Sequence, residues 1–310
     1  WLDNIPEVIK LDDVKKKYSI QKKENEVIPA IGEFDDPYNQ RQGPVQIDFK
    51  HQGNVIVYGN AESGKETLIS TMVFDVINTY SVKETNIYII DFGSEALKIF
   101  REAPQIGDVV LSTDSEKVSR LFEMIQKEMK KRTELISNYG GDIKLFISDT
   151  GIPMPQIIII INNYEGFIET YGEKYDDVLL TLCRDGIKYG ISFVLTASAY
   201  NSVRYRLAQN FRNKIALQLN NEDDYLNIIE GIRKQRPAHL FGRGLVKFDN
   251  IYEFQTARIC EPEKWNAYIK DEIKMLQEKY EERAEKIPVM PNQIKVEDIK
   301  EYITSIDKLP

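Results

Sequence analysis

Apolar runs separated by amphipathic stretches dominate the pattern of this chain. The runs show no polar alternation, which is expected of strands that are buried on both faces of a parallel sheet. The runs that end at Asp91 and begin at Gln156 are the most pronounced. We predict buried strands at Asn54–Gly59, Asn86–Asp91, Asp108–Thr113, Gln156–Ile161, Ile191–Ala197 and Asn213–Leu219.

Helical spacing appears between these runs. In the clearest case, apolar side chains recur at three- and four-residue intervals between Val118 and Ile136, after Asp114 or Ser115 as a cap. Further helices are predicted at about 64–80, 174–188 and 262–286. Strands that alternate with helices indicate an α/β fold with a mostly parallel central sheet flanked by helices.

Two segments depart from the buried-strand pattern. Val45–Phe49 alternates between apolar and polar residues, which is typical of an edge strand. The strand-like segments on either side of Asp249–Asn250 predict a hairpin near the end of the sheet.

The chain divides into three regions by composition. Residues 1–45 are polar and rich in proline, and we expect an irregular leader that packs on the core. Residues 46–286 carry the alternating pattern of the main domain, and residues 287–310 are expected to be a linker towards a further module. Because the sequence starts at Trp1, we expect it to be a fragment of a longer protein.

Charge and cysteine content narrow the functional classes. Of 310 residues, 42% are hydrophobic and 29% charged, which is typical of a globular protein. The net charge of −8 weighs against nucleic-acid binding, because phosphate contacts need a surplus of basic residues. Cys183 and Cys260 lie in apolar surroundings without metal-ligand spacing, and we expect reduced core thiols.

The segment GNAESGKET follows the predicted strand at Asn54–Gly59 and opens a predicted helix. It matches G-x-x-x-x-G-K, a loop whose amide groups and helix amino terminus bind phosphate. Lys65 is expected to reach the β- and γ-phosphates of a nucleotide. The candidate nucleotide-binding residues are Gly59, Asn60, Ala61, Glu62, Ser63, Gly64, Lys65, Glu66 and Thr67.

Glu66 occupies the position where this loop normally has Ser or Thr. That hydroxyl ligates Mg²⁺, whereas a carboxylate adds negative charge beside the polyphosphate. A carboxylate can also bind Mg²⁺, so Glu66 is a weak metal candidate. Thr67 is no simple substitute, because one helical step turns its side chain by about 100°.

The isoleucine strand ends in Asn162 and Asn163, where related sites carry an acidic pair that holds the metal and activates water. Asparagine is neutral and cannot act as a base. Glu165 is a weak catalytic candidate two residues later, although a cap or a solvated strand end is the simpler interpretation of both Glu165 and Asp91. We therefore expect ATP and Mg²⁺ binding to be weak or absent, and hydrolysis to be very slow or absent.

Several segments resemble FtsK/SpoIIIE-type motor ATPases. The similarity lies in residues 88–136 and 184–248, and the leader at 32–49, "TAS" (196–198), "DDY" (223–225) and "GRGL" (242–245) are most similar to the tandem modules of type VII secretion ATPases. The family pattern often has Gly-Arg where this chain has Gly186 and Ile187, so an arginine contribution there is not expected.

This resemblance implies a RecA-like fold in the cytosolic part of a membrane-anchored protein. It also implies neighbouring ATPase modules in the same chain, a hexamer in the full assembly, helical secreted proteins as substrates, and work on proteins rather than nucleic acid. Our preferred hypothesis is a degenerate nucleotide-binding module that couples or regulates its neighbours.

Three alternatives stay open. The first is an active ATPase with Glu66 and Glu165 as rewired metal ligands. The second is a peptide-docking module with an unused nucleotide pocket. The third, a DNA translocase, is disfavoured by the acidic charge and by the lack of a winged-helix segment.

Overall fold

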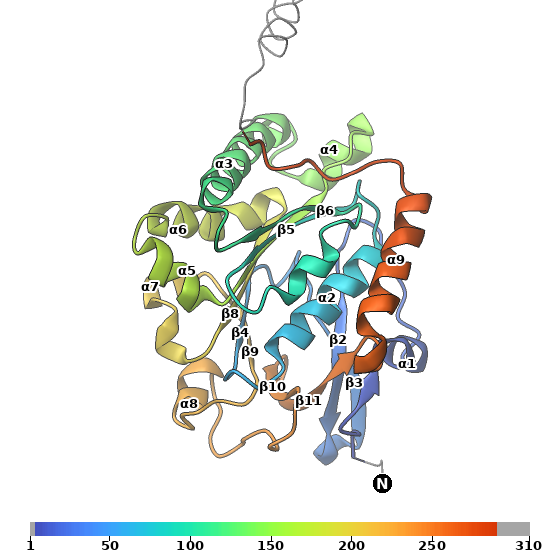
Figure 1. Cartoon of the computed structure of the whole chain (residues 1–310), viewed down its shortest axis with the longest axis vertical. Helices are drawn as coiled ribbons and strands as arrows, with labels where there is room; N and C mark the ends of the chain where they lie inside the picture. The colour runs from blue at the N-terminus through green and yellow to red at the C-terminus, as the bar shows by residue number, and fades with distance from the viewer. Residues whose placement is uncertain (1–3, 290–310) are drawn as a thin grey trace, which may run out of the picture.

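The computed structural model describes residues 4–289, and a single sheet runs through this whole part of the chain (Figure 1). The strand order is β3-β2-β11-β10-β9-β4-β8-β7-β5-β6, and β1 pairs with β11 beyond this path. The strands are β1 (Ile9–Lys10), β2 (Ala30–Asp36), β3 (Arg41–Gln46), β4 (Val55–Tyr58), β5 (Thr85–Asp91), β6 (Ile106–Leu111), β7 (Gln156–Asn162), β8 (Ile191–Ala197), β9 (Asn213–Ala216), β10 (Arg243–Lys247) and β11 (Ile251–Arg258).

The sheet has a parallel half and an antiparallel half. From β9 through β4, β8, β7 and β5 to β6, all neighbours are parallel. From β9 through β10, β11 and β2 to β3, all neighbours are antiparallel. The parallel half contains the predicted buried strands, so the α/β expectation is confirmed, and the predicted hairpin is β10–β11.

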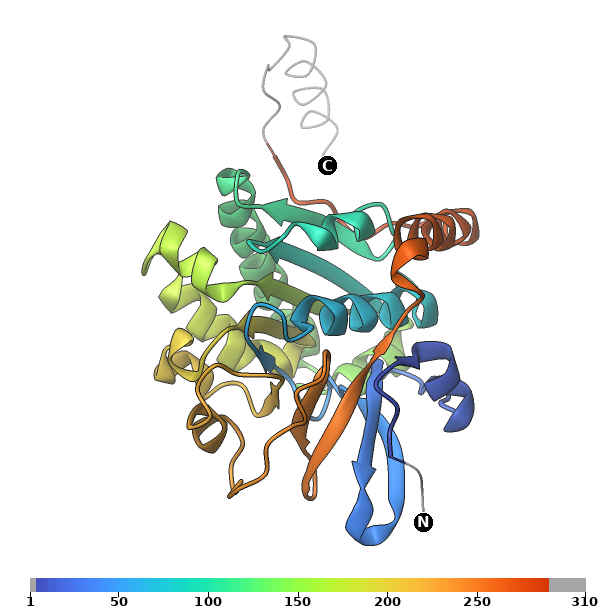
Figure 2. The same ribbon diagram turned by 60° about the horizontal axis from the view of Figure 1, so that its bottom comes forward.

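Helices cover both faces of the sheet (Figures 1 and 2). One hydrophobic cluster joins the sheet to α1, α2 and α9, and a second joins the opposite face to α3, α5, α6, α7 and α8. No helix within residues 4–289 is both long and apolar enough to span a bilayer. The helices are α1 (Leu11–Lys17), α2 (Lys65–Thr79), α3 (Ser115–Ser137), α4 (Ile143–Thr150), α5 (Tyr164–Tyr171), α6 (Asp176–Asp185), α7 (Tyr205–Ala208), α8 (Asp224–Ile228) and α9 (Trp265–Lys279).

The expectation of an irregular segment at residues 1–45 was wrong in part. This segment forms α1 and the hairpin β2–β3, which extends the sheet beyond β11. The strand β2 was not predicted because it contains acidic residues, which are uncommon in buried strands. Glu33 is nevertheless only 4% exposed, because its carboxylate accepts a 2.6 Å hydrogen bond from the Tyr18 hydroxyl and pairs with Lys17. Most of the predicted linker at 287–310 lies outside the described residues.

The topology brings several loops to one edge of the sheet. The parallel strands β4, β7 and β8 are neighbours that end at the same edge, and the loop before α2 lies there. In open α/β sheets, ligands bind at this carboxyl edge. The opposite edge, where β5, β7 and β8 begin, carries a separate cleft described below.

Candidate nucleotide-binding site

The loop between β4 and α2 has the backbone that a phosphate loop requires. Gly64 lies at φ 95° as the amino-terminal cap of α2, a conformation that favours glycine. A Cβ at Gly59 would lie 2.3 Å from the Ser63 hydroxyl, so this position also needs glycine. Ser63 is buried, and its amide and hydroxyl both donate to the Asn60 carbonyl. These contacts hold the turn in front of the helix.

A cavity of about 450 Å³ opens at this loop. It brings together most of the residues predicted from sequence on the loop and after β7, while Gly59, Asn60, Glu62 and Ser63 do not line it. Thr67 is among the lining residues despite its position one helical step beyond Glu66. The full lining is Ala61, Gly64, Lys65, Glu66, Thr67, Gly93, Ser94, Asn162, Asn163, Glu165, Thr196, Ser198 and Phe241.

Lys65 folds back over the loop. Its ammonium donates to the carbonyl oxygens of Gly59 and Asn60, the latter at 2.6 Å. Burial lowers the pKa of Lys65, while Glu165 and Glu66 act in the opposite direction. An ammonium has three donors, of which two are used within the loop and one is left, so phosphate oxygens must displace a loop carbonyl to gain more than one contact from Lys65.

Glu66 is tied to the loop that follows β5. Its carboxylate accepts hydrogen bonds from the Ser94 hydroxyl at 2.7 and 2.8 Å and from the Ser94 amide at 3.2 Å. A short Ser or Thr at position 66 could not span to Ser94 in this way. The carboxylate therefore serves as a strap between α2 and the β5 loop.

Asn162 lies in a buried polar network. Its side-chain amide donates to Asp91 at 2.9 Å, and its carbonyl oxygen accepts from the Thr196 hydroxyl at 2.8 Å. Asp91 is 1% exposed and also accepts from the amides of Gly93 and Leu97. Burial raises the pKa of Asp91 despite these hydrogen bonds.

Neither sequence interpretation of Asp91, a cap or a solvated strand end, describes its place in the structure. Asp91 is no solvated strand end, since its carboxylate is buried behind Asn162. Its carboxylate instead accepts from the amides of Gly93 and Leu97, and Leu97 belongs to the short 3₁₀ turn Ala96–Phe100, whose cap residue is Glu95. The pairing of β5 with β7, which sequence reasoning did not supply, places Asp91 beside Asn162.

Asn163 has a structural role at the start of α5. It adopts φ 62°, a left-handed conformation that asparagine tolerates. Its side-chain oxygen accepts from the Gly166 amide, and its side-chain nitrogen donates to the Phe92 carbonyl at 2.8 Å. Both ends of the amide are thus committed to the fold.

Glu165 lies in the first turn of α5 and faces the cavity. Its carboxylate accepts from the hydroxyl and the amide of Ser198. Burial raises the pKa of Glu165, but hydrogen bonds from Ser198 and Ser202 outweigh it, and the pKa is lowered overall. A carboxylate with a lowered pKa is a weaker base, so this environment does not favour water activation.

The donors at the site fit a nucleotide better than a divalent cation. The glycine loop and the helix amino terminus suit phosphate. Within residues 4–289, no group of three or more His, Cys, Asp or Glu side chains is arranged to hold a metal ion. Glu66 is bound by Ser94, and Asn162 and Asn163 are bound by the fold. The residues at this site therefore do not fit a bound Mg²⁺ ion.

Phe241 is a lining residue that the sequence did not single out. Its side chain is 47% exposed, and the Arg258 guanidinium lies 5.6 Å from its ring centre. The next residue, Gly242, donates from its amide to the Ser63 carbonyl at 3.0 Å. The segment before β10 is thus fastened to the phosphate loop.

Comparison with known proteins gives consistent matches. The profile of the FtsK/SpoIIIE family matches residues 17–245. The type VII secretion system protein EssC of Staphylococcus aureus strain MRSA252 is 27% identical over 312 aligned residues, which cover 97% of this chain and 21% of EssC. The chain therefore spans about a fifth of the length of this curated relative.

Solved structures share the fold. EssC (ATPases 2 and 3) from Geobacillus thermodenitrificans superposes with a TM-score of 0.86 at 24% identity, over 97% of this chain and 57% of that one. EccC (ATPases 2 and 3) of Thermomonospora curvata, solved in complex with a signal sequence peptide, gives a TM-score of 0.75 at 22% identity, over 89% of this chain and 51% of that one. These likenesses show the same RecA-like ATPase architecture.

Proposed function

This chain belongs to the FtsK/SpoIIIE family, and we propose that it is a degenerate nucleotide-binding module of a type VII secretion ATPase. In this proposal the pocket binds ATP weakly or transiently and hydrolyses it very slowly or not at all. Its work is to couple or regulate neighbouring ATPase modules of the same protein during export.

One observation carries the proposal: the three positions that would hold the metal and activate water are all committed to the fold. Glu66 is held by Ser94, Asn162 lies between Asp91 and Thr196, and Asn163 caps α5. Phosphoryl transfer depends on positioning and on neutralisation of charge by metal. A site without free ligands at these positions can neither position a metal ion and the attacking water nor neutralise the charge that develops on the phosphate.

Nucleotide binding is a separate property and has its own support. The backbone amides of the glycine loop, the amino terminus of α2 and Lys65 are the groups that bind phosphate in such loops. Lys65 would exchange its contacts with the loop carbonyls for phosphate oxygens. The expected affinity is lowered by this competition and by the negative charge of Glu66.

The relatives support a proposed cellular setting for this chain. Structures of EssC and EccC that contain ATPases 2 and 3 share this fold, and one of these relatives was solved with a signal sequence peptide. We propose that this chain lies on the cytosolic side of a membrane-anchored protein, within a hexamer, next to further modules that act on helical secreted proteins. Nucleic acid is not an expected partner, given the net charge of −8.

The test is a titration of the purified module with a fluorescent ATP analogue, with and without Mg²⁺, beside a steady-state phosphate-release assay. We expect saturable binding that Mg²⁺ changes little, and turnover at background. Lys65→Ala should weaken binding at least about tenfold, as loss of a charged phosphate contact implies.

Other results would favour the other hypotheses. Turnover above background that Glu66→Ala abolishes would show an active ATPase with rewired ligands. Absence of nucleotide binding in both wild type and Lys65→Ala would leave a docking module with an unused pocket. Tight DNA binding at physiological salt would instead indicate a translocase.

A further inference from the structure

A second cleft lies at the edge of the sheet opposite the phosphate loop. Its volume is about 660 Å³, within the range of ligand sites. Gln156 at the start of β7 and Gly190 just before β8 are part of its wall, which places it at the amino ends of the parallel strands. The rest of the wall comes from the segment before β2, the β3–β4 connection, the α2–β5 connection, α4 with its flanking turns, and the turn before β8.

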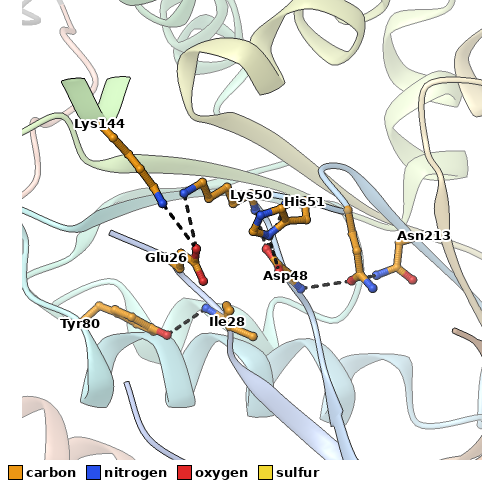
Figure 3. A network of polar contacts seen from close by, with 9 residues as sticks. Glu26, Ile28, Asp48, Lys50, His51, Tyr80, Lys144 and Asn213 are labelled. Carbon is orange, nitrogen blue, oxygen red and sulfur yellow. Dashed lines mark hydrogen bonds and ion pairs between the residues drawn. The ribbon is translucent and has the colours of Figure 1, made fainter. Parts of the chain in front are cut away.

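Two ammonium groups in this cleft share one carboxylate. Figure 3 shows the side chains of Lys50 and Lys144 pointing from different segments toward Glu26. The Nζ atoms lie 3.4 and 3.9 Å from the same Oε1 atom. Charge-assisted N–H···O bonds are normally about 2.7–2.9 Å long, so neither lysine is closely bound.

The other acidic groups of the cleft, and Lys83, have partners elsewhere. Glu84 pairs with Lys22 at 2.6 Å, and Asp142 caps α4 by accepting from two backbone amides. Lys83 is paired with Glu282 at 3.0 Å. These charges therefore do little to balance the lysine pair.

The lysine pair thus has one carboxylate for two positive charges, and Lys188 adds a third positive charge to the lining of the cleft. Burial, followed by the nearby Lys144 ammonium, lowers the pKa of Lys50 despite the presence of Glu26. A surplus of positive charge in one cleft contrasts with the net charge of −8 of the whole chain.

The segment that supplies Glu26 indicates what kind of ligand fits. Glu26 projects its carboxylate at the lysines, while the next residue, Val27, is buried at 5% exposure. The remaining wall offers apolar surface against which further apolar side chains, like that of Val27, could pack. The apolar lining residues are Ile143, Ile147, Pro153, Met154 and Ile187.

We propose that this cleft binds an acidic polypeptide segment of a partner protein, with a Glu or Asp carboxylate between Lys50 and Lys144 and adjacent apolar side chains on the Ile143–Ile147 wall. A bare anion such as phosphate would satisfy the lysines and leave the apolar wall exposed. A segment with a carboxylate next to apolar residues satisfies both.

This inference does not depend on nucleotide binding. The cleft shares no lining residue with the cavity at the phosphate loop, and the two lie at opposite edges of the sheet. Lys65→Ala should therefore leave binding at the cleft unchanged. Failure of the nucleotide proposal and failure of this one are separately observable.

The experiment uses the intact chain and a fluorescein-labelled peptide, Gly-Leu-Glu-Val-Glu-Ile-Gly, with its Gln-for-Glu counterpart as reference. We expect anisotropy to show binding of the acidic peptide only, and weakening by at least about tenfold when salt rises from about 0.05 to 0.5 M. Lys50→Gln with Lys144→Gln should lower the affinity at least about tenfold. Inorganic phosphate serves as the competing probe.

Glu26→Gln is the most informative variant, because it removes the competing carboxylate and keeps the shape. It should strengthen binding of the acidic peptide by about three- to tenfold. Lys127→Gln with Lys130→Gln, on the exposed side of α3, alters charge equally and should change nothing. Lys50→Arg with Lys144→Arg keeps the charge and should retain binding, which separates loss of charge from loss of folding.

Two results would overturn the proposal. One is an unchanged or weaker peptide affinity in Glu26→Gln when circular dichroism shows an intact fold, since the lysine pair would then be only a structural strap. The other is lysine-dependent binding of inorganic phosphate without any binding of the acidic peptide.

Discussion

The side-chain amide of Asn162 donates a 2.9 Å hydrogen bond to the carboxylate of Asp91, at the register position where β5 and β7 end side by side. A working site would carry an acidic residue at the end of β7, whereas here the acidic residue, Asp91, lies at the end of the neighbouring strand β5. Asn162 lines the cavity at the phosphate loop and Asp91 does not. The negative charge is present but lies behind a neutral side chain.

Asn162→Asp alone should not restore hydrolysis. It replaces a hydrogen bond by two carboxylates in contact at a position where both residues are at most 2% exposed. We expect the free energy of unfolding to fall by about 3 kcal/mol at neutral pH, as for an unpaired buried charge. Urea denaturation at pH 7 measures this change.

The exchanged double variant, Asp91→Asn with Asn162→Asp, is the matched control. It restores one carboxylate and one amide in the same contact and places the acid at the end of β7. Its stability should lie closer to wild type than that of Asn162→Asp. Equal losses in the two variants would contradict the assigned contact.

Asp91 should give the stability a pH dependence of definite sign. Its pKa is raised in the folded state because of burial, so the folded chain holds this proton more tightly than the unfolded chain. Stability then falls as pH rises from about 3.9, the unfolded value, through the raised folded pKa.

Asp91→Asn removes the titrating carboxyl group. The stability of this variant should therefore change less with pH between the unfolded and the folded pKa of Asp91. The measurement is the difference in Tm between wild type and Asp91→Asn from acid to neutral pH, since other carboxylates cancel in the difference. A difference that does not change with pH would show that the pKa of Asp91 is not raised.

Glu66→Ser should raise the affinity for ATP without restoring turnover. The change removes a negative charge from the phosphate site, supplies the usual hydroxyl and frees Ser94. We expect about a three- to tenfold gain in Mg²⁺-ATP binding, measured by titration, because one unfavourable charge is removed. Phosphate release should stay at background, since β7 still ends in Asn162 and Asn163. Robust turnover in this single variant would contradict the importance of the β7 positions.

Phe241→Ala should weaken binding of ATP but not of inorganic tripolyphosphate. In the sheet, β4 lies between β8 and β7 on one side and β9 and β10 on the other. The positions that would face the γ-phosphate, Asn162 and Asn163, lie at the end of β7, so we expect the adenine base of a bound ATP to point toward β10, where Phe241 is exposed. Loss of stacking on an aromatic ring costs about 1–3 kcal/mol, which is roughly 5- to 150-fold in affinity.

Tyr205→Ala is the control for this prediction. Tyr205 is 70% exposed on α7 and does not line the cavity. Competition titrations with ATP and tripolyphosphate should give the same values for this variant as for wild type. An equal loss of both ligands in Phe241→Ala would instead indicate damage to the phosphate loop.

The sequence determined the parallel half of the sheet and the position of the phosphate loop. Long apolar runs such as Gln156–Ile161 are compatible only with burial on both faces, and the two glycines of the loop mark one backbone conformation that other residues avoid, at Gly64, and one position without room for a side chain, at Gly59. It also identified Glu66, Asn162 and Asn163 as departures from a working site. These features are local, so neighbouring residues suffice to predict them.

Only the tertiary structure decided what these departures contact. Strand pairing brings Asp91 beside Asn162, and a loop contact joins Ser94 to Glu66. The strand β2 was missed because Glu33 is a charged residue inside it. The partners of its carboxylate, Lys17 and Tyr18, lie in another segment of the chain, and a local sequence pattern does not reveal them. Contacts between segments far apart in the chain depend on strand order, and this order is set by packing of the whole sheet.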